Sequence, residues 1–245
     1  MIQDRIEAKL DFLKSIPSWL ALKNKHIGKR GFVIGNGPSL NAGQLDLLKD
    51  EITIASNKIY LVFNETEWRP KYYTISDNLV WQKVGNIVGS YFDKVYTSNS
   101  NRGNPEGVKK VVWRNRGKVL EPRNGFFSRS PILGLFGGST VTFDNMQLAV
   151  FMGLNPIYLI GCDHFYDEAK NAEELKPIRH ENKSNHFHKD YRKPGELVNP
   201  APIAQMDLAY GAAADFATKN KWMIKNLTPG GFLEAFPRDS LETIL

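Results

Sequence analysis

The sequence predicts an α/β fold: a single Rossmann-like domain with a doubly wound, mostly parallel sheet, spanning residues 1–245. Three observations lead to this prediction. Short apolar segments alternate with stretches of helical spacing, which is the pattern of βα repeats. A glycine-rich turn follows the first of these segments, at residues 35–37. Residues 156–161 are apolar throughout, as expected for a central parallel strand covered on both faces.

The composition suits one large domain, with 42% hydrophobic and 24% charged residues. A chain of this length buries roughly 70–75% of its unfolded surface. The single cysteine, Cys162, excludes an internal disulfide and favours a reducing compartment. No run approaches the ~18–20 apolar residues of a membrane span, and the N-terminus lacks an apolar secretion core. The prediction is a cytoplasmic protein.

Residues 1–29 precede the catalytic core of the domain, which is expected over residues 30–238. Ile6, Leu10 and Leu13 have helical spacing and predict an amphipathic helix laid on the domain. A basic lead-in follows, and the net charge of +6 helps to recruit phosphorylated ligands or an anionic surface. Peripheral contact with the inner membrane is therefore one interpretation, and a solvated face is the other. No motif that reads DNA or RNA is present, so no nucleic-acid partner is predicted.

The first strand is expected at residues 31–34, followed by the turn Gly35-Asn36-Gly37-Pro38-Ser39 and a helix from Asn41. This layout is typical of a phosphate-binding βα unit, where glycines let backbone N–H groups approach a ligand. Leu40 stands where a dinucleotide motif has its third glycine, and no Walker Lys-Ser/Thr follows. The turn therefore predicts a nucleotide-type ligand other than NAD. The alternative is a plain βα turn.

Further elements alternate along the chain. Strands are expected at residues 52–56, 71–75, 94–97, 110–113, 156–161 and 222–226. Helices are expected at residues 79–88, from Ser139 or Thr140 to 152, and at 205–219. Residues 99–107 read as a loop, and residues 114–138 fit no element. Residues 164–200 are polar and lack periodicity, which is typical of a long lid loop.

Polar residues follow several of the expected strands, namely Asn57, Asp77 and Asp163. In an open α/β sheet, ligands bind outside the carboxyl ends of the strands. We therefore expect these residues, with Asn36, to form the wall of a binding site. Asp163 either binds a ligand hydroxyl or Mg²⁺, or caps a loop. Cys162 fits a small buried apolar residue better than a nucleophile.

The lid carries the densest polar stretch of the chain, residues 185–191. His186 and His188 are candidates for a general base, because imidazole titrates near neutral pH. A His-x-His pair without a firm third ligand is weak evidence for zinc, so no metal site is predicted. The alternative is a polar loop with incidental histidines.

Four segments carry a resemblance to known families. They are residues 35–40, 56–57, 138–142 and 157–163. Together they resemble the bacterial sialyltransferases of glycosyltransferase family 42. They also resemble the family named after the archaeal 6-hydroxymethylpterin diphosphokinase, and residues 185–191 and 226–231 are similar to the second family in particular.

The sialyltransferase resemblance implies an inverting, metal-independent transferase that uses a CMP-activated acidic sugar, such as sialic acid or a Kdo-like sugar, to modify a surface glycan or glycoconjugate. No cofactor is implied beyond the donor substrate. The resemblance implies donor contacts at Asn36, Gly37 and Asn57, and its Ser-Thr pair corresponds roughly to Ser139 and Thr140. Gly35, Ser39, Asp77 and Asp163 complete the nucleotide site that we expect. His188 or His186 corresponds to the base that deprotonates the acceptor. Tyr166, with Tyr191 as the second candidate, corresponds to the tyrosines that stabilise the leaving phosphate.

The second family implies an alternative function, an ATP- and Mg²⁺-dependent diphosphokinase acting on a pterin-like alcohol. Asp77 and Asp163 would then hold the metal, which would clamp the phosphates. A non-catalytic module that binds a nucleotide or glycan is a third interpretation. The resemblance also suggests a homo-oligomer.

Overall fold

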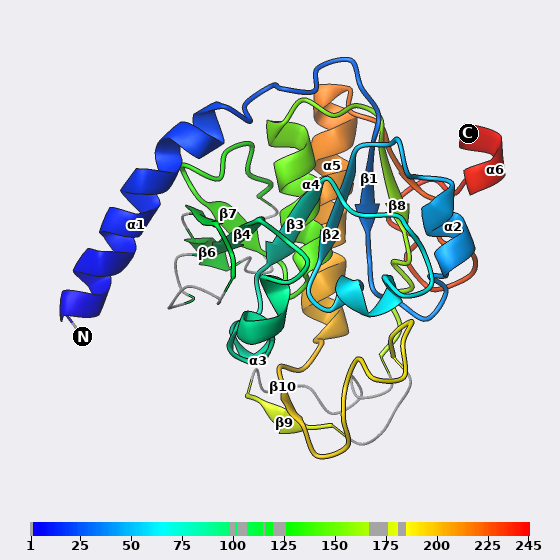
Figure 1. The fold of residues 1–245 in the computed structure, drawn as a ribbon. Coiled ribbons are helices and arrows are strands. Elements are labelled where there is room, and N and C mark those ends of the chain that lie inside the picture. The colour runs from blue at the N-terminus through cyan, green and yellow to red at the C-terminus, as the bar shows by residue number, and fades with distance from the viewer. Residues whose placement is uncertain are drawn as a thin grey trace.

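The computed structural model describes residues 2–98, 101, 107–114, 116–119, 126–166, 176–180 and 185–245. Seven strands form one sheet in the order β11-β8-β1-β2-β3-β4-β5, and every neighbouring pair is parallel (Figure 1). This sheet confirms the predicted α/β fold. Its strands are β1 (Gly31–Ile34), β2 (Thr53–Ser56), β3 (Tyr72–Ile75), β4 (Lys94–Ser98), β5 (Lys110–Arg114), β8 (Ile157–Ile160) and β11 (Ile224–Asn226).

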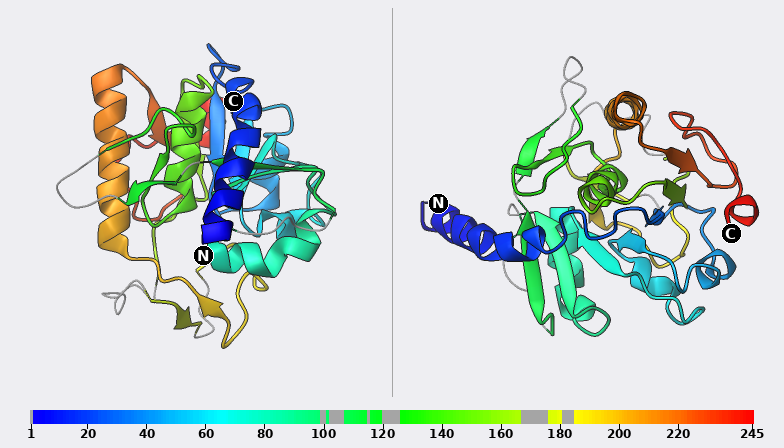
Figure 2. Two further views of the ribbon diagram at one scale, coloured as in Figure 1. Left: turned by 90° about the vertical axis from the view of Figure 1, so that its left-hand side faces the viewer. Right: turned by 90° about the horizontal axis from the view of Figure 1, so that it is seen from above.

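Helices cover both faces of this sheet (Figure 2). Val33 of β1 belongs to the apolar cluster on one face, whereas its neighbours Phe32 and Ile34 belong to the cluster on the other. The first face is covered by α4 (Val141–Phe151) and α5 (Ile203–Asn220). The second is covered by α2 (Ala42–Asp46), the 3₁₀ helix η1 (Ile59–Val62) and α3 (Asn78–Val88). Burial on both faces explains why the central strands β1 and β8 are apolar throughout.

The N-terminal helix α1 (Ile2–Leu20) differs from the prediction in the face that it presents to the domain. Ile6, Leu10 and Leu13 are 48%, 49% and 47% exposed, although they were expected to pack on the domain. Trp19 packs instead, and it is 1% exposed. The N-terminal half of α1 extends away from the body of the molecule in both the front view and the view from above (Figures 1 and 2).

Several short elements lie where no element was predicted. β6 (Arg116–Val119) pairs with β7 (Leu135–Gly137) within the unassigned stretch. β9 (Ile178–Arg179) pairs with β10 (Leu197–Val198) within the lid, beneath the sheet in Figure 1, and α6 (Leu241–Ile244) ends the chain. Most of the loop predicted at residues 99–107 lies outside the described residues. In the described part of the chain, no helix has the length and apolarity needed to cross a membrane.

Candidate functional site

The strand order places a switch point between β1 and β8. The chain moves outward from β1 to β5 and then returns to β8 on the other side of β1. A cavity of about 540 Å³ lies there, at the carboxyl ends of the strands. Ten of the predicted site residues line it, namely Gly35, Asn36, Gly37, Asn57, Asp77, Ser139, Thr140, Asp163, Tyr166 and His186. Ser39 and His188 are the predicted site residues that do not. In doubly wound folds, ligands bind at such a switch point, outside the carboxyl ends of the strands.

Backbone hydrogen bonds join the glycine turn after β1 to the end of β8. The Gly35 N–H donates to the carbonyl of Ile160 at 2.7 Å, and the Gly37 N–H donates to that of Gly161 at 2.8 Å. A Cβ on Gly35 would overlap the Gly161 carbonyl, and one on Gly37 would overlap the Asp163 carboxylate. The expectation that these two N–H groups face a ligand is therefore wrong. The glycines allow two chain segments to approach each other closely.

The helix after this turn does not supply the expected anion site. α2 has five residues, and its N-terminus is closed by a capping box between Asn41 and Gln44. Two longer helices, α3 and α4, point their N-termini at the cavity instead. The Asp77 carboxylate caps α3 by accepting from the N–H groups of Leu79 and Val80, and the Thr140 hydroxyl caps α4. The Asp77 carboxylate already offsets the positive end of α3, whereas the neutral Thr140 cap leaves the positive end of α4 to favour a negatively charged ligand in the cavity.

Asp163 lines the cavity and accepts hydrogen bonds from Ser39, which does not line it. One oxygen of Asp163 accepts from the Ser39 N–H at 3.2 Å, and the other accepts from the Ser39 hydroxyl at 2.8 Å. Burial raises the pKa of Asp163, and these hydrogen bonds oppose that rise. The carboxylate therefore joins the end of β8 to the turn after β1.

The four carboxylates among the described residues of the cavity lining are each engaged by the protein. Asp144 pairs with Arg114 and accepts from Ser76, and Glu196 pairs with two lysines. Asp77 and Asp163 also accept two hydrogen bonds each. Within the part of the chain that the structure describes, no group of three His, Cys, Asp or Glu residues could hold a metal. Both oxygens of Asp163 already accept a hydrogen bond from Ser39, whereas Asp77 accepts both of its hydrogen bonds on Oδ1, so a Mg²⁺ bound by Asp163 would share its oxygens with Ser39.

The lid brings His186 to the cavity. Its ring stacks on Tyr191, with centroids 3.8 Å apart, and Tyr166 meets it edge-on at 6.3 Å. Burial lowers the pKa of His186 well below 6.5, and the charge of Arg192 adds to this effect. His186 is therefore neutral near pH 7, and the same causes make it a weaker base than a free imidazole. Burial also raises the pKa values of Tyr166 and Tyr191, so both phenols stay protonated and able to donate.

His188 lies outside the cavity lining. Its Nδ1 accepts from the Asp190 N–H at 3.1 Å and lies 3.8 Å from the Asp190 carboxylate. The lid also docks on the turn after β1, because the Phe187 N–H donates to the Asn36 carbonyl at 3.1 Å. The loop geometry thus directs the two histidines to different places, although they are two residues apart.

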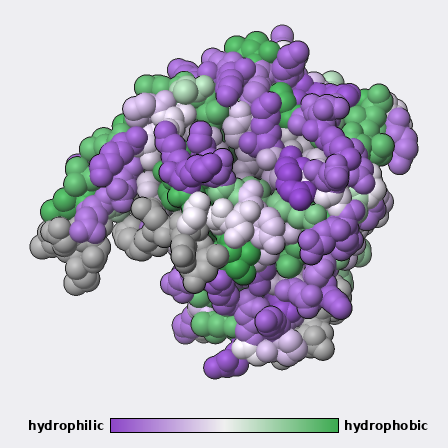
Figure 3. Space-filling view, viewed as in Figure 1, coloured by the Kyte–Doolittle hydropathy of each residue, from purple (hydrophilic) through white to green (hydrophobic). Residues whose placement is uncertain are grey.

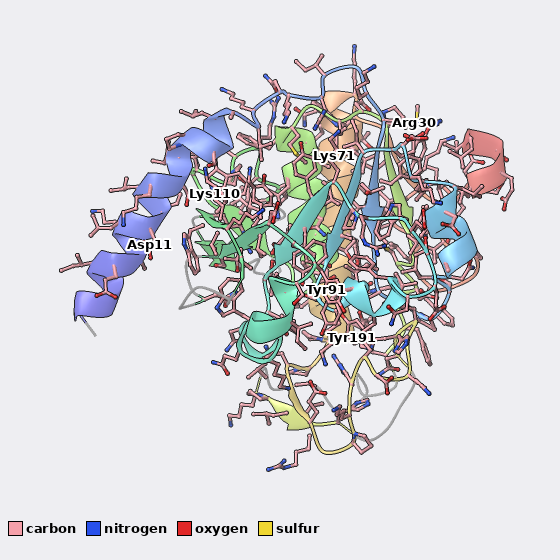
Figure 4. The ribbon with its side chains drawn as sticks, in the orientation of Figure 1. Asp11, Arg30, Lys71, Tyr91, Lys110 and Tyr191 are labelled. Carbon is pink, nitrogen blue, oxygen red and sulfur yellow. The ribbon has the colours of Figure 1, made fainter. Side chains whose placement is uncertain are left out.

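Four cationic side chains line the cavity, those of Lys58, Lys83, Arg114 and Arg192. Lys58 donates to the Tyr191 carbonyl at 2.6 Å, and both Lys58 and Lys83 reach Glu196, at 3.3 and 2.8 Å. Burial alone would raise the pKa of Glu196, but the hydrogen bonds and charges of these partners outweigh it and lower the pKa to about 2. Tyr191, labelled in Figure 4, lies at this junction of lid and sheet.

Two further features of the site were not predicted. The His164 Nε2 lies 2.6 Å from a carboxylate oxygen of Asp207, on α5, and the His164 ring meets Tyr210 edge-on. Asn57, Ser139 and His164 each have a φ of 55°, which is uncommon for residues other than glycine. Such conformations gather at functional sites. His164 could have been predicted as a site residue, because it follows directly after a strand that ends at the site. Asp207 could not, because it lies on a helix 43 residues further along the chain.

The amide oxygens of Asn36 and Asn57 add a final feature. Both are buried and accept no hydrogen bond from any described residue. The Asn36 amide group donates to Ser56, and the Asn57 side chain bonds to Tyr191. Buried polar atoms are nearly always paired in proteins, so these two oxygens are acceptors available to a ligand hydroxyl or amine.

Fold and cavity together define a doubly wound α/β protein with a polar, cation-lined ligand site at its switch point. Residues 5–169 match the family described as 6-hydroxymethylpterin diphosphokinase MptE-like, and the chain belongs to that family. No curated protein and no solved structure matches the chain. The resemblance to the sialyltransferases of glycosyltransferase family 42 stays a prediction.

Proposed function

We propose that this protein is a transferase that moves a sugar from a nucleotide donor to an acceptor hydroxyl, without a metal, and that His186 is its general base. The observation that carries the proposal is the half-buried His186, stacked on Tyr191, on a cavity wall that also carries Lys58 and Arg192. Transfer from a phosphate leaving group needs a base at the acceptor and positive charge at the departing oxygen. The cavity offers both.

In this proposal the nucleotide lies over the turn after β1, where the amide oxygens of Asn36 and Asn57 accept from it. The donor phosphate faces the N-terminus of α4. The acceptor oxygen attacks the anomeric carbon as His186 takes its proton, and the bond from that carbon to the phosphate oxygen breaks. Lys58, Arg192 and the protonated phenols of Tyr166 and Tyr191 offset the charge of the released nucleotide.

The proposed donor is a CMP-activated acidic sugar, and the proposed acceptor is a surface glycan or glycoconjugate. The engaged state of the cavity carboxylates favours a mechanism in which protein cations, rather than Mg²⁺, neutralise the leaving group. An enclosed site also excludes water, which would otherwise hydrolyse the donor.

A second candidate is diphosphoryl transfer from ATP to a pterin-like alcohol, which the family match favours. Here Mg²⁺ would supply the charge stabilisation for the phosphates. Asp77 and Asp163 would hold the metal, and His186 would again take the proton of the alcohol.

The two candidates differ in their need for metal, so one assay separates them. The protein is incubated with CMP-sialic acid and a panel of glycan acceptors in EDTA, and in parallel with ATP, Mg²⁺ and 6-hydroxymethyl pterin. Release of CMP that depends on the acceptor and persists in EDTA supports glycosyl transfer. AMP formation that requires Mg²⁺ supports the second candidate and contradicts the first. If neither product forms with any acceptor, both proposals are contradicted in favour of a binding module.

A further inference from the structure

Helix α1 has two stripes of side chains, and one of them packs on the domain. The Trp19 indole N–H donates to the Trp113 carbonyl on the edge strand β5 at 2.8 Å, and the Ser15 hydroxyl accepts from the Trp113 N–H at 2.9 Å. The Trp19 ring also lies 5.2 Å from that of Tyr96 and 6.3 Å from that of Phe151. This inner stripe fixes the C-terminal half of α1 to the edge of the sheet.

The opposite stripe is apolar and exposed. Ile6, Leu10, Leu13 and Leu20 are 48%, 49%, 47% and 57% exposed. Pro17 completes a spacing of four, three, four and three residues, which is the a/d repeat of a helix pair. Figure 3 shows hydrophobic residues along the outer edge of the arm that α1 forms. A helix with one apolar stripe packed on its own domain and a second apolar stripe on the opposite side is suited to join this domain to a partner.

The geometry points to a second copy of this chain as the occupant: we propose that α1 pairs with α1 of another protomer through Ile6, Leu10, Leu13 and Leu20. The stripe is two residues wide per heptad, which fits a helix seam better than the broad apolar face of a membrane-bound helix. Charge supports this choice. α1 carries three acidic residues (Asp4, Glu7, Asp11) and three basic ones (Arg5, Lys9, Lys14), so an anionic lipid surface does not attract it.

An antiparallel pair is self-complementary. With a two-fold axis midway between Leu10 and Leu13, Leu10 of each copy meets Leu13 of the other, and Ile6 meets Pro17. The same register brings Glu7 opposite Lys14, which is favourable, whereas a parallel pair sets Lys9 near Lys14 across the seam. The pairing would also stabilise the projecting half of α1, because a helix of this length that lacks packing is marginal in water.

The test uses the full chain in sedimentation and light-scattering measurements over a range of concentrations. The expected mass is twice the 27.8 kDa of the chain, falling to one chain on dilution. Leu10→Asp should abolish the dimer, whereas Leu47→Asp, which changes an exposed leucine directly after α2, should leave it intact. A protein that is monomeric throughout, or a dimer that survives Leu10→Asp, would overturn the proposal.

Charge reversal keeps the test valid if Leu10→Asp disturbs folding. Glu7→Lys and Lys14→Glu should each weaken the dimer, and the double variant should restore it if the pair is antiparallel. Failure of the double variant to restore the dimer would overturn the antiparallel register. Flotation with phosphatidylserine vesicles tests the other occupant, and vesicle binding that Leu10→Asp removes would contradict a protein partner.

Discussion

His186 stacks on Tyr191 with the ring planes 9° from parallel and the centroids 3.8 Å apart. Both residues belong to the lid, and both line the cavity. The stack covers one face of the half-buried imidazole, and partial burial together with the charge of Arg192 keeps it neutral. Lys58 donates to the Tyr191 carbonyl and so joins this part of the lid to the strand edge. The position of the proposed base thus depends on the docking of the lid.

His186→Ala should lower the rate of transfer by about 10²–10⁴-fold, the usual contribution of a general base. His188→Ala is the matched control, since it removes a lid histidine two residues away that does not line the cavity. Its rate should stay near that of the unaltered protein. Steady-state transfer rates of both variants test this prediction. A large loss of rate in His188→Ala, with none in His186→Ala, would assign the general base to His188 instead.

His186 also predicts how stability depends on pH. Its pKa in the folded protein is lowered below 6.5, so the unfolded chain binds the proton more readily. Stability therefore rises with pH in this range. It is fully present above about pH 6.5 and falls as the pH drops towards the folded pKa. Urea unfolding at pH 7.5 and 5.5 measures the difference, which should shrink in His186→Asn. An unchanged difference would show that His186 is not buried in its neutral form.

Gly37→Ala tests the close approach of the turn to β8. The added Cβ would overlap the Asp163 carboxylate, so the turn or Asp163 must move, at a cost of about 1–3 kcal/mol. We expect lower stability together with weaker nucleotide binding. Gly211→Ala is the control, because it lies within α5 with no atom close to the new methyl group. That change should stabilise the protein by about 0.5–1 kcal/mol. Equal effects in both variants would refute the packing role of Gly37.

Much of the fold and part of the site could be predicted from the sequence. Asn57, Asp77 and Asp163 were expected to meet because carboxyl ends of parallel strands share one edge, and all three line the cavity. The role of Gly37 was not accessible, since its limiting contact, Asp163, lies 126 residues further along the chain. The periodicity of α1 was recognised, but two stripes repeat along it. Local spacing does not determine which one meets the edge strand.

Glu196→Gln tests the ion pairs that join Glu196 of the lid to Lys58 and Lys83. The change leaves Lys58 and Lys83 without their charged acceptor and should cost about 1–3 kcal/mol near pH 7. The Glu196 pKa is lowered from 4.5 to about 2, so its contribution is present above pH 4.5 and is lost as the pH falls towards 2. Unfolding curves from pH 7 to 2.5 should therefore converge for the variant and the unaltered protein.

A matched exposed ion pair serves as the control for this variant. Glu234 pairs with Arg238 four residues away, and its side chain is 71% exposed. Glu234→Gln should leave stability unchanged, because exposed pairs contribute little. If Glu196→Gln changes stability as little as Glu234→Gln does, the ion pairs of Glu196 do not stabilise the docked lid.

The most direct test of a metal-independent nucleotide site is a thermal-shift titration with CMP and CDP against ADP and ATP, each in EDTA and in Mg²⁺. A ligand at ~100 times its dissociation constant should add about 2.7 kcal/mol to the stability of the folded state. The proposal predicts stabilisation by the cytidine nucleotides in EDTA, and a smaller shift in Gly37→Ala. Stabilisation by ATP alone, and only with Mg²⁺, would contradict it, as would the absence of a shift with all four nucleotides.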